Sequence, residues 1–307
     1  MQPIWWILAM FAALYIVLIL GPAILSFFKV FSRLSPNIAL FSDDGPYGDE
    51  LHKAREFLQA LPHQTVTITA KDGTPLCADF YDGRCSRTVV LLHGYRSLPY
   101  YQLAAQSVFF YQNGFNLLLI TQRAHGESGG KRSTLGLKER DDLLSWLAFL
   151  DGKTSEVLLY GSSMGAATVA YASDRLPDTV KGMVLDCGFT SPYDQLLWDC
   201  RKRHLPAHAL LPIMRLLGQW VLREDIRRQT TDALKNTTVP ALFVQGGADQ
   251  TVKPEQTEKN RAACASDNTV VLVPQARHMT AFLDDPASVK AHLTAFINKN
   301  FKEERSR

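Results

Sequence analysis

The stretch Tyr160-Gly161-Ser162-Ser163-Met164-Gly165 contains the pattern G-x-S-x-G, with Ser163 at its centre. The apolar run 156–160 before it predicts a strand, and residues 164–172 after it predict a helix. A serine on a sharp strand-to-helix turn has a strained backbone and an exposed hydroxyl, and its glycines allow neighbouring backbones to approach closely. The five-residue pattern alone often arises by chance. The interpretation of Ser163 as a nucleophile therefore depends on its setting and on partners later in the chain.

Short apolar runs alternate with amphipathic segments along most of the chain. The expected strands are residues 65–70, 76–81, 88–92, 115–120, 156–160, 182–185, 241–244 and 270–273. The expected helices are residues 49–61, 103–112, 137–150, 164–172, 254–263 and a last one that begins at Pro286 with Asp285 as its N-cap. This alternation predicts an α/β class with a mostly parallel sheet covered by helices on both faces.

Composition bounds the class of protein. The chain has 307 residues, of which 46% are hydrophobic and 21% charged, which is enough for a packed core and excludes a disordered chain. A net charge of +3 gives no indication of nucleic-acid binding. The five cysteines form no C-x-x-C pair, so neither a zinc site nor redox chemistry is indicated, and no metal or cofactor is expected. A disulfide between Cys77 and Cys85 is left open.

The first charged residue is Lys29, and residues 4–28 are almost wholly apolar. As a helix they would be about 37 Å long, enough to cross a hydrocarbon core of about 30 Å. We expect a retained membrane anchor rather than a cleaved signal peptide, because no basic segment precedes the apolar run and no clear cleavage site follows it. Gly21-Pro22 is expected to kink or end the first helical run. Lys29 and Arg33 favour a cytoplasmic side for the rest of the chain, although two residues leave the side open.

Three regions follow from these patterns. Residues 1–35 form the anchor, residues 36–64 a linker and an amphipathic helix, and residues 65–303 the α/β domain. The amphipathic helix packs either on that domain or on a bilayer. An apolar insertion at about 191–235 carries eight basic and five acidic residues, and it is expected to form a small helical cap over the site. It is either a lid that recognises a lipid-like substrate near an anionic membrane or a cap with a solvated charged face.

A serine nucleophile needs a base and an orienting acid, expected in the order acid then histidine on loops after later strands. Asp249 directly follows the apolar run 241–244, and His278 lies between the last strand and the last helix. Such loops at the carboxyl ends of parallel strands are where these sheets bind ligands. We therefore assign Ser163, His278 and Asp249 as a triad. Asp186, which also follows a strand, is the alternative acid.

The oxyanion of an acyl-transfer transition state requires backbone N–H donors. Met164, immediately after the nucleophile, is expected to supply one amide, and Tyr95, in the loop after strand 88–92, the other. His93 in the same loop is expected to make structural hydrogen bonds rather than act as a base.

Five motifs in order resemble those of the alpha/beta-hydrolase superfamily, most of all its membrane-anchored, BEM-like and serine-aminopeptidase-like members. They are Leu92-His93-Gly94-Tyr95, Arg123-Ala124-His125-Gly126-Glu127-Ser128-Gly129-Gly130, Gly161-Ser162-Ser163-Met164-Gly165, Gly246-Gly247-Ala248-Asp249 and Arg277-His278. The likeness covers residues 60–300 and implies the same triad and oxyanion hole as above. Gln122 departs from the aspartate common there, and Arg123 and His125 are expected to be structural.

The sequence thus predicts a carboxylesterase-like serine hydrolase that cleaves small-molecule or lipid-like acyl esters through an acyl-serine intermediate. A serine at this turn argues against dehalogenase and epoxide hydrolase chemistry, which use aspartate there in this superfamily. A peptidase, amidase or thioesterase on the same triad is the alternative, and a non-catalytic membrane-tethered binding protein is a remote one. The oligomeric state is not predicted.

Overall fold

The computed structural model describes residues 2–33 and 35–301. Contacts divide the chain into two compact units. Arg33–Thr190 with Gln229–Arg307 forms the sheet unit, and Met1–Ser32 with Ser191–Arg228 forms the helical unit. Each unit is described in turn below.

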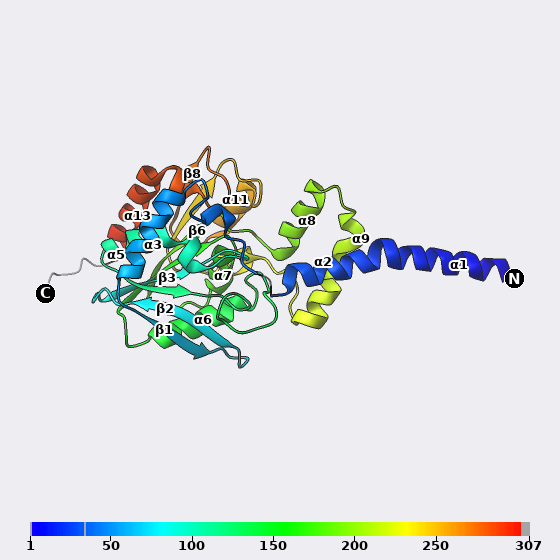
Figure 1. The fold of residues 1–307 in the computed structure, drawn as a ribbon, viewed down its shortest axis with the longest axis horizontal. Helices are drawn as coiled ribbons and strands as arrows, with labels where there is room; N and C mark the ends of the chain where they lie inside the picture. The colour runs from blue at the N-terminus through cyan, green and yellow to red at the C-terminus, as the bar shows by residue number, and fades with distance from the viewer. Residues whose placement is uncertain (1, 34, 302–307) are drawn as a thin grey trace. The chain divides into compact units, whose positions relative to one another are not determined.

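An eight-stranded sheet with the order β1-β2-β4-β3-β5-β6-β7-β8 is the centre of the sheet unit (Figure 1). Its strands are β1 His63–Thr69, β2 Pro75–Tyr81, β3 Arg87–Leu92, β4 Asn116–Ile120, β5 Glu156–Ser162, β6 Val180–Asp186, β7 Ala241–Gly246 and β8 Asn268–Val273. β2 pairs antiparallel with both neighbours, and the pairs from β4 to β8 are parallel. All seven residues of β5 are buried, as expected for a strand covered on both faces.

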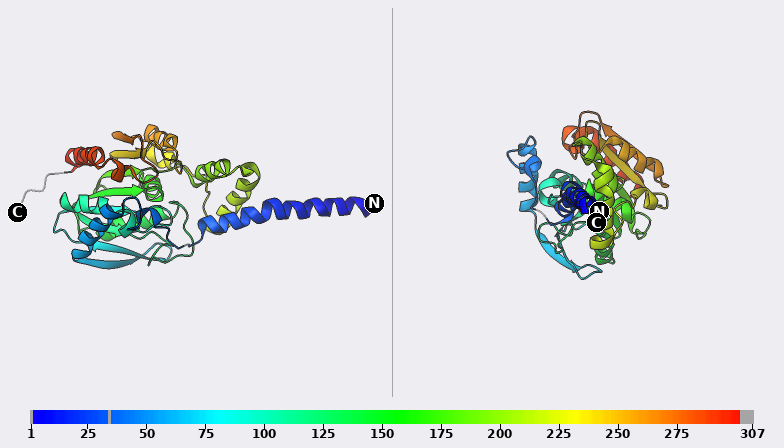
Figure 2. Two further views of the ribbon diagram at one scale, coloured as in Figure 1. Left: turned by 45° about the horizontal axis from the view of Figure 1, so that its top comes forward. Right: turned by 90° about the vertical axis from the view of Figure 1, so that its right-hand side faces the viewer.

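Helices cover both faces of the sheet (Figures 1 and 2). One apolar core contains residues of α3 (Gly48–Ala60), α5 (Ala104–Gln112), α12 (Ala281–Asp284) and α13 (Pro286–Asn300). The other contains residues of α6 (Glu139–Leu150), α7 (Met164–Ala172) and α10 (Thr230–Leu234). Two further helices, α4 (Pro99–Gln102) and α11 (Pro254–Ala263), and a 3-10 turn at Ala39–Phe41 complete this unit among the described residues.

The amphipathic helix α3 belongs to the sheet unit. Its Leu51 and Leu58 are fully buried in the same core as Phe110 of α5, and α3 contacts α5. The apolar side of this helix therefore packs on the sheet unit, which is one of the two possibilities that its sequence left open. The last helix begins as predicted, with the Asp285 carboxylate accepting the backbone N–H of Ser288 at 3.0 Å.

The helical unit contains the apolar N-terminal run. α1 (Gln2–Tyr15), a π-helical stretch η1 (Ile16–Leu20) and α2 (Gly21–Phe31) follow one another without a break. Within the described residues, Ile4–Phe31 is the one helix long and apolar enough to cross a membrane. Gly21-Pro22 does not end this run. Pro22 lacks an N–H, and in a regular α-helix its ring would clash with the carbonyl four residues earlier. The π-helical stretch lies just before Pro22, and its wider turns accommodate the proline.

The rest of the helical unit is the insertion, Ser191–Arg228. It consists of α8 (Pro192–Lys202), α9 (Ala207–Leu217) and a π-helical stretch η3 (Gly218–Leu222). α9 contacts both α8 and α2. The sequence predicts that the insertion ends at about residue 235. In the structure, residues 229–235 belong to the sheet unit, because α10 packs on α7 and α11.

The turn from β5 to α7 is the tightest point of the sheet unit. A Cβ placed on Gly165 would lie 2.1 Å from the carbonyl oxygen of Leu92 in β3, and one on Gly161 would lie 2.4 Å from the carbonyl carbon of Gly165. Between them, Ser163 has φ 54° and ψ −111°, a conformation that costs a non-glycine residue energy. The G-x-S-x-G pattern is thus required by backbone crowding.

Replacing Gly165 with alanine is expected to prevent stable folding, because the new methyl group would collide with the backbone of β3 rather than with a movable side chain. We expect a destabilisation of more than about 3 kcal/mol, measured as a fall in the thermal unfolding midpoint or as loss of soluble protein. Gly73→Ala is the control: its φ is +84°, but no heavy atom lies within 4 Å of the added Cβ. It should cost only about 1 kcal/mol. Equal losses in the two variants would contradict this account.

Candidate active site

Three residues predicted to form a triad lie in one hydrogen-bonded chain. Nε2 of His278 lies 2.9 Å from Oγ of Ser163, and Nδ1 of His278 lies 2.7 Å from Oδ2 of Asp249. Ser163 is the N-cap residue of α7, Asp249 follows β7 and His278 follows β8. The carboxyl ends of neighbouring parallel strands thus bring together residues that are up to 115 positions apart.

The protein backbone fixes the carboxylate of Asp249. Its Oδ1 accepts the N–H groups of Thr251 at 2.7 Å and Val252 at 2.9 Å, which leaves Oδ2 for the imidazole. The Asp249 side chain is fully buried, whereas His278 remains 13% exposed. A carboxylate next to Nδ1 favours the imidazole tautomer in which Nδ1 carries the hydrogen and Nε2 is the acceptor.

The loop after β3 lies against the nucleophile. A Cβ on Gly94 would be 3.4 Å from Cβ of Ser163, so the next residue, Tyr95, belongs to the surroundings of that side chain. Met164 is the first residue of α7, and the N–H groups of a helix's first turn have no partner within the helix. The role of the Tyr95 and Met164 amides as oxyanion donors remains a prediction.

Gln102 is a site residue that the sequence did not reveal. Its Oε1 accepts the N–H of Gly94 at 2.8 Å, and its Nε2 donates to Oγ of Ser162 at 2.9 Å. One buried amide therefore ties the loop after β3 to the residue beside Ser163. A glutamine in a four-residue helix carries no recognisable pattern, so only its spatial neighbours identify this role.

Two histidines near the site are occupied by the backbone. Nδ1 of His93 lies 2.7 Å from the Gly94 carbonyl oxygen, and Nε2 of His93 accepts the N–H of Gln122 at 3.0 Å. Burial lowers the pKa of His93 to about 3, so the ring stays neutral. His125 is engaged in the same way by the carbonyl of Arg123 at 2.9 Å and the N–H of Arg96 at 3.0 Å. Both rings support loops, and neither has a nitrogen left for proton transfer.

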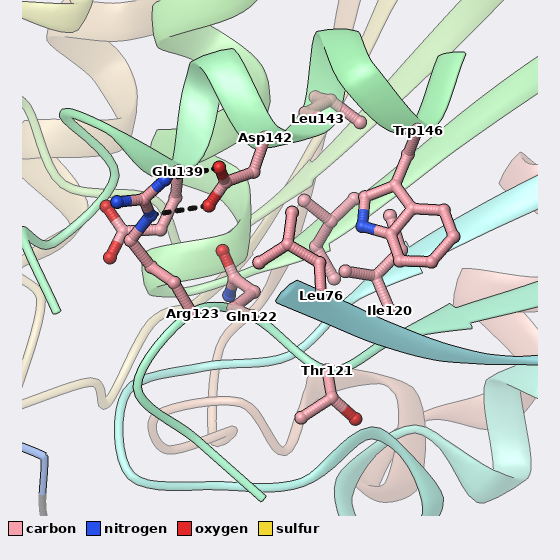
Figure 3. A pocket seen from close by; sticks show the side chains of 10 residues that line it. Leu76, Ile120, Thr121, Gln122, Arg123, Glu139, Asp142, Leu143 and Trp146 are labelled. Atoms are coloured by element: carbon pink, nitrogen blue, oxygen red, sulfur yellow. Dashed lines mark hydrogen bonds and ion pairs between the residues drawn. The ribbon is translucent and has the colours of Figure 1, made fainter. Parts of the chain in front are cut away.

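Arg123 forms a buried ion pair. Its Nε donates to Asp142 at 2.6 Å and its Nη1 to Asp72 at 2.8 Å. Burial alone would lower the pKa of Arg123, but the hydrogen-bonded Asp142 carboxylate raises it above its ordinary value. Figure 3 shows the guanidinium facing Asp142, with Glu139 beside it, in a small cavity that is also lined by Leu76, Ile120, Leu143 and Trp146. These contacts assign Arg123 to the support of the loop after β4.

Asp186, the alternative acid, has different partners. Its Oδ2 accepts the hydroxyl of Tyr160 at 3.2 Å and that of Ser162 at 3.4 Å, and its Oδ1 has no hydrogen-bond partner among the described residues. Burial raises the pKa of Asp186 to about 6, although the nearby His278 lowers it. Its backbone carbonyl accepts the N–H of Ser163 at 2.8 Å. Asp186 thus supports the turn through its backbone, and no hydrogen bond joins its carboxyl to His278.

All five cysteines are free thiols, which leaves Cys77 and Cys85 unpaired in this structure. Cys187 is the one beside the triad: its Sγ and one ligand atom each of Asp249 and His278 all lie within 4.8 Å of one another. Burial raises the pKa of the Cys187 thiol well above its ordinary value, so the group is a neutral neighbour of the acid–base pair.

Residues 89–291 match the model of the Alpha/beta hydrolase family, and the chain belongs to this family. It is 27% identical over 225 residues to the uncharacterized protein YqkD of Bacillus subtilis (69% of this chain, 71% of that one). It is 25% identical over 238 residues to an uncharacterized membrane protein of Saccharomyces cerevisiae (74% and 77%). It is 25% identical over 172 residues to protein bem46 of Schizosaccharomyces pombe (55% and 53%). The predicted family and the likeness to BEM-like proteins are confirmed.

Among solved structures, an esterase of Pyrococcus furiosus is similar to this chain with a TM-score of 0.68 and 20% sequence identity. The match covers 89% of this chain and the whole of that one. At this identity the likeness establishes the shared fold, and the predicted alpha/beta-hydrolase fold is confirmed.

Asp249 and Asp186 are expected to differ in how much activity is lost when each carboxylate is replaced by an amide. Asp249→Asn should lower kcat by about 10³–10⁴-fold, because the amide no longer holds His278 in the tautomer that accepts the Ser163 proton. Asp186→Asn should lower it by less than about tenfold, because no hydrogen bond joins that carboxyl to His278. Steady-state kinetics on one ester at neutral pH compares the variants. A larger loss for Asp186→Asn would transfer the acid role to Asp186.

Asp186 should also make the stability depend on pH. Its folded-state pKa of about 6 lies above the ordinary aspartate pKa of 3.8, so the folded state holds this proton more tightly than the unfolded state. Its stabilising contribution is present below about pH 4 and is lost as the pH rises through about 6. Asp186→Asn should therefore gain up to about 3 kcal/mol relative to wild type between pH 4 and pH 7. Thermal unfolding of both proteins across this range measures the gain, and a constant difference would contradict it.

Proposed function

We propose that this protein is a serine hydrolase that cleaves carboxylic esters through an acyl-serine intermediate. The observation that carries the proposal is the hydrogen-bonded chain from Ser163 through His278 to Asp249. The protein's membership of the Alpha/beta hydrolase family and its similarity in fold to an esterase support the same reaction class. No metal ion or organic cofactor takes part in the proposed reaction.

In the proposed reaction, Nε2 of His278 takes the proton of Ser163 as Oγ attacks the ester carbonyl carbon. The backbone amides of Tyr95 and Met164 stabilise the negative charge that develops on the carbonyl oxygen. His278 then gives its proton to the leaving alcohol, and the acyl group stays on Oγ. A water molecule next attacks the acyl-serine while His278 again takes a proton, which releases the acid and restores Ser163.

We also propose that the N-terminal helix anchors the enzyme in a membrane as a single span. The side chains of residues 4–11 and 13–18 are exposed, and a relative of the chain is named a membrane protein. Lys29 and Arg33 follow the span, which favours the cytoplasmic side for the sheet unit.

A peptidase, amidase or thioesterase on the same triad is the alternative function, because the triad chemistry is shared by all of these acyl transfers. A short p-nitrophenyl ester, a thioester and an aminoacyl-arylamide offer the same enzyme three leaving groups. We expect the ester to have the highest kcat/KM. A higher kcat/KM on the arylamide would replace the esterase proposal with a peptidase.

Ser163→Ala should abolish labelling by a fluorophosphonate probe and lower ester turnover by more than about 10⁴-fold, while the thermal unfolding midpoint stays near that of wild type. The matched control is Ser162→Ala, the adjacent serine, whose hydroxyl bonds to Gln102 and Asp186 and not to His278. This control should still be labelled. Labelling that persists in Ser163→Ala, or is lost only in Ser162→Ala, would refute the assignment.

A further inference from the structure

Helix α9 and the η3 stretch that continues it are apolar on two sides. The inner side is buried within the helical unit and consists of Leu210, Leu211, Met214 and Leu222. α9 contacts α2, in which Ala23, Phe27 and Phe31 are buried. The N-terminal helix and the insertion therefore share an apolar core of their own.

The outer side of this segment is apolar as well. Pro212, Leu216 and Trp220 are spaced four residues apart and all are exposed, Leu216 by 61% and Trp220 by 89%. We call these three residues the outer stripe. Arg215 is the one Lys, Arg, Asp or Glu in α9, and its guanidinium is paired with Asp225 at 2.9 Å. The segment also exposes His208 and Gln219. A helix that exposes apolar side chains in addition to a buried apolar side is typical of a segment that contacts lipid or protein.

The position of α9 along the N-terminal helix indicates which of these it contacts. The apolar run is exposed at residues 4–11 and 13–18, whereas Ala23, Phe27 and Phe31 of α2 are covered by protein, so lipid contact is expected along α1 and η1. These two segments contain 14 and 5 residues and extend roughly 28 Å, close to the roughly 30 Å of a hydrocarbon core. α9 contacts η1 and α2, which is where a helix of this length would leave the hydrocarbon. Tryptophan is enriched in that interfacial layer, and the exposed Arg201, Arg203 and Arg223 of the insertion suit anionic headgroups.

We propose that the outer stripe lies in the interfacial layer of the membrane that the N-terminal helix crosses, and that the enzyme takes its acyl ester from that leaflet. This inference rests on the proposed ester hydrolysis and on the proposed anchor. The N-terminal helix holds α9 at the depth of the headgroups, so the insertion is a fixed membrane-contacting element and its substrate class is an ester dissolved in the bilayer.

Chain connectivity links this element to the triad. The insertion leaves the sheet unit after Thr190 and returns at Gln229, and the N–H of Thr230 donates to the Thr190 carbonyl at 2.8 Å. Thr190 comes three residues after Cys187, the thiol beside Asp249 and His278. Both ends of the insertion are therefore joined to the part of the sheet unit that contains Cys187, Asp249 and His278.

Fluorescence quenching tests the membrane contact without any turnover. The full chain is placed in phosphatidylcholine vesicles in which about one fifth of the lipid is anionic. The experiment is done with ordinary lipids and with lipids that carry bromine on their acyl chains. The emission of Trp220 is the difference between wild type and Trp220→Phe. We expect bromine to quench more than about half of this difference, as for a side chain in contact with acyl chains. If bromine does not quench the Trp220 emission, the proposal is overturned. If this emission is also shielded from iodide in solution, the outer stripe contacts a protein partner or a second copy instead.

Activity tests the substrate class with a matched control. Leu216→Ser with Trp220→Ser should lower kcat/KM on a long-chain monoacylglycerol in the same vesicles by roughly tenfold and change it less than about twofold on a short soluble p-nitrophenyl ester. Leu272→Ser removes a leucine of β8 that is 56% exposed and should leave both values unchanged. Equal losses on both substrates, or none, would overturn the inference. If wild type hydrolyses neither ester, the proposed function fails, whereas the quenching result still tests the membrane contact.

Discussion

The close approach of three backbones at the β5–α7 turn is the constraint on which the site depends. Gly165 lies against the carbonyl of Leu92 and Gly161 lies against Gly165, so α7 begins almost in contact with β3. The chain makes this crossing only if Ser163 takes a positive φ, which turns its side chain out of the sheet. The same crossing brings the loop after β3 within van der Waals distance of the serine. One steric requirement thus places both the proposed nucleophile and one of its proposed oxyanion donors.

Buried hydrogen bonds join the loops around this turn. Gln102 joins Gly94 to Ser162, and Thr168 of α7 donates to Oε1 of Gln122 at 3.0 Å. Arg123 joins the loop after β4 to Asp142 of α6. Directional bonds of this kind fix distances that apolar contacts leave adjustable, and each is expensive to break because its partner would remain buried. The sequence departure at Gln122 is consistent with this role, since an amide both donates and accepts.

The order of strands and helices, the turn at Ser163 and the partners Asp249 and His278 were accessible from sequence, because each follows from periodicity or from its place after a strand. The role of Gln102 was not, since it depends on two neighbours that lie 8 and 60 residues away. The packing partner of the insertion could not be predicted from sequence either. Its apolar residues predict helices, but only coordinates show that α9 packs on α2, because an apolar helix face carries no information about which apolar face it meets.

Asp186 and Asp249 show why the acid is assigned by environment rather than by position after a strand. Both follow parallel strands of the same sheet, and both are buried. Asp249 lies in a loop that turns two N–H groups onto one carboxyl oxygen and leaves the other oxygen for the His278 imidazole. Oδ2 of Asp186 accepts two hydroxyl groups, its other oxygen is unpaired among the described residues, and burial raises the pKa of this carboxyl. A carboxylate that orients a proton-accepting imidazole must remain charged while buried, and the loop after β7 provides what that requires.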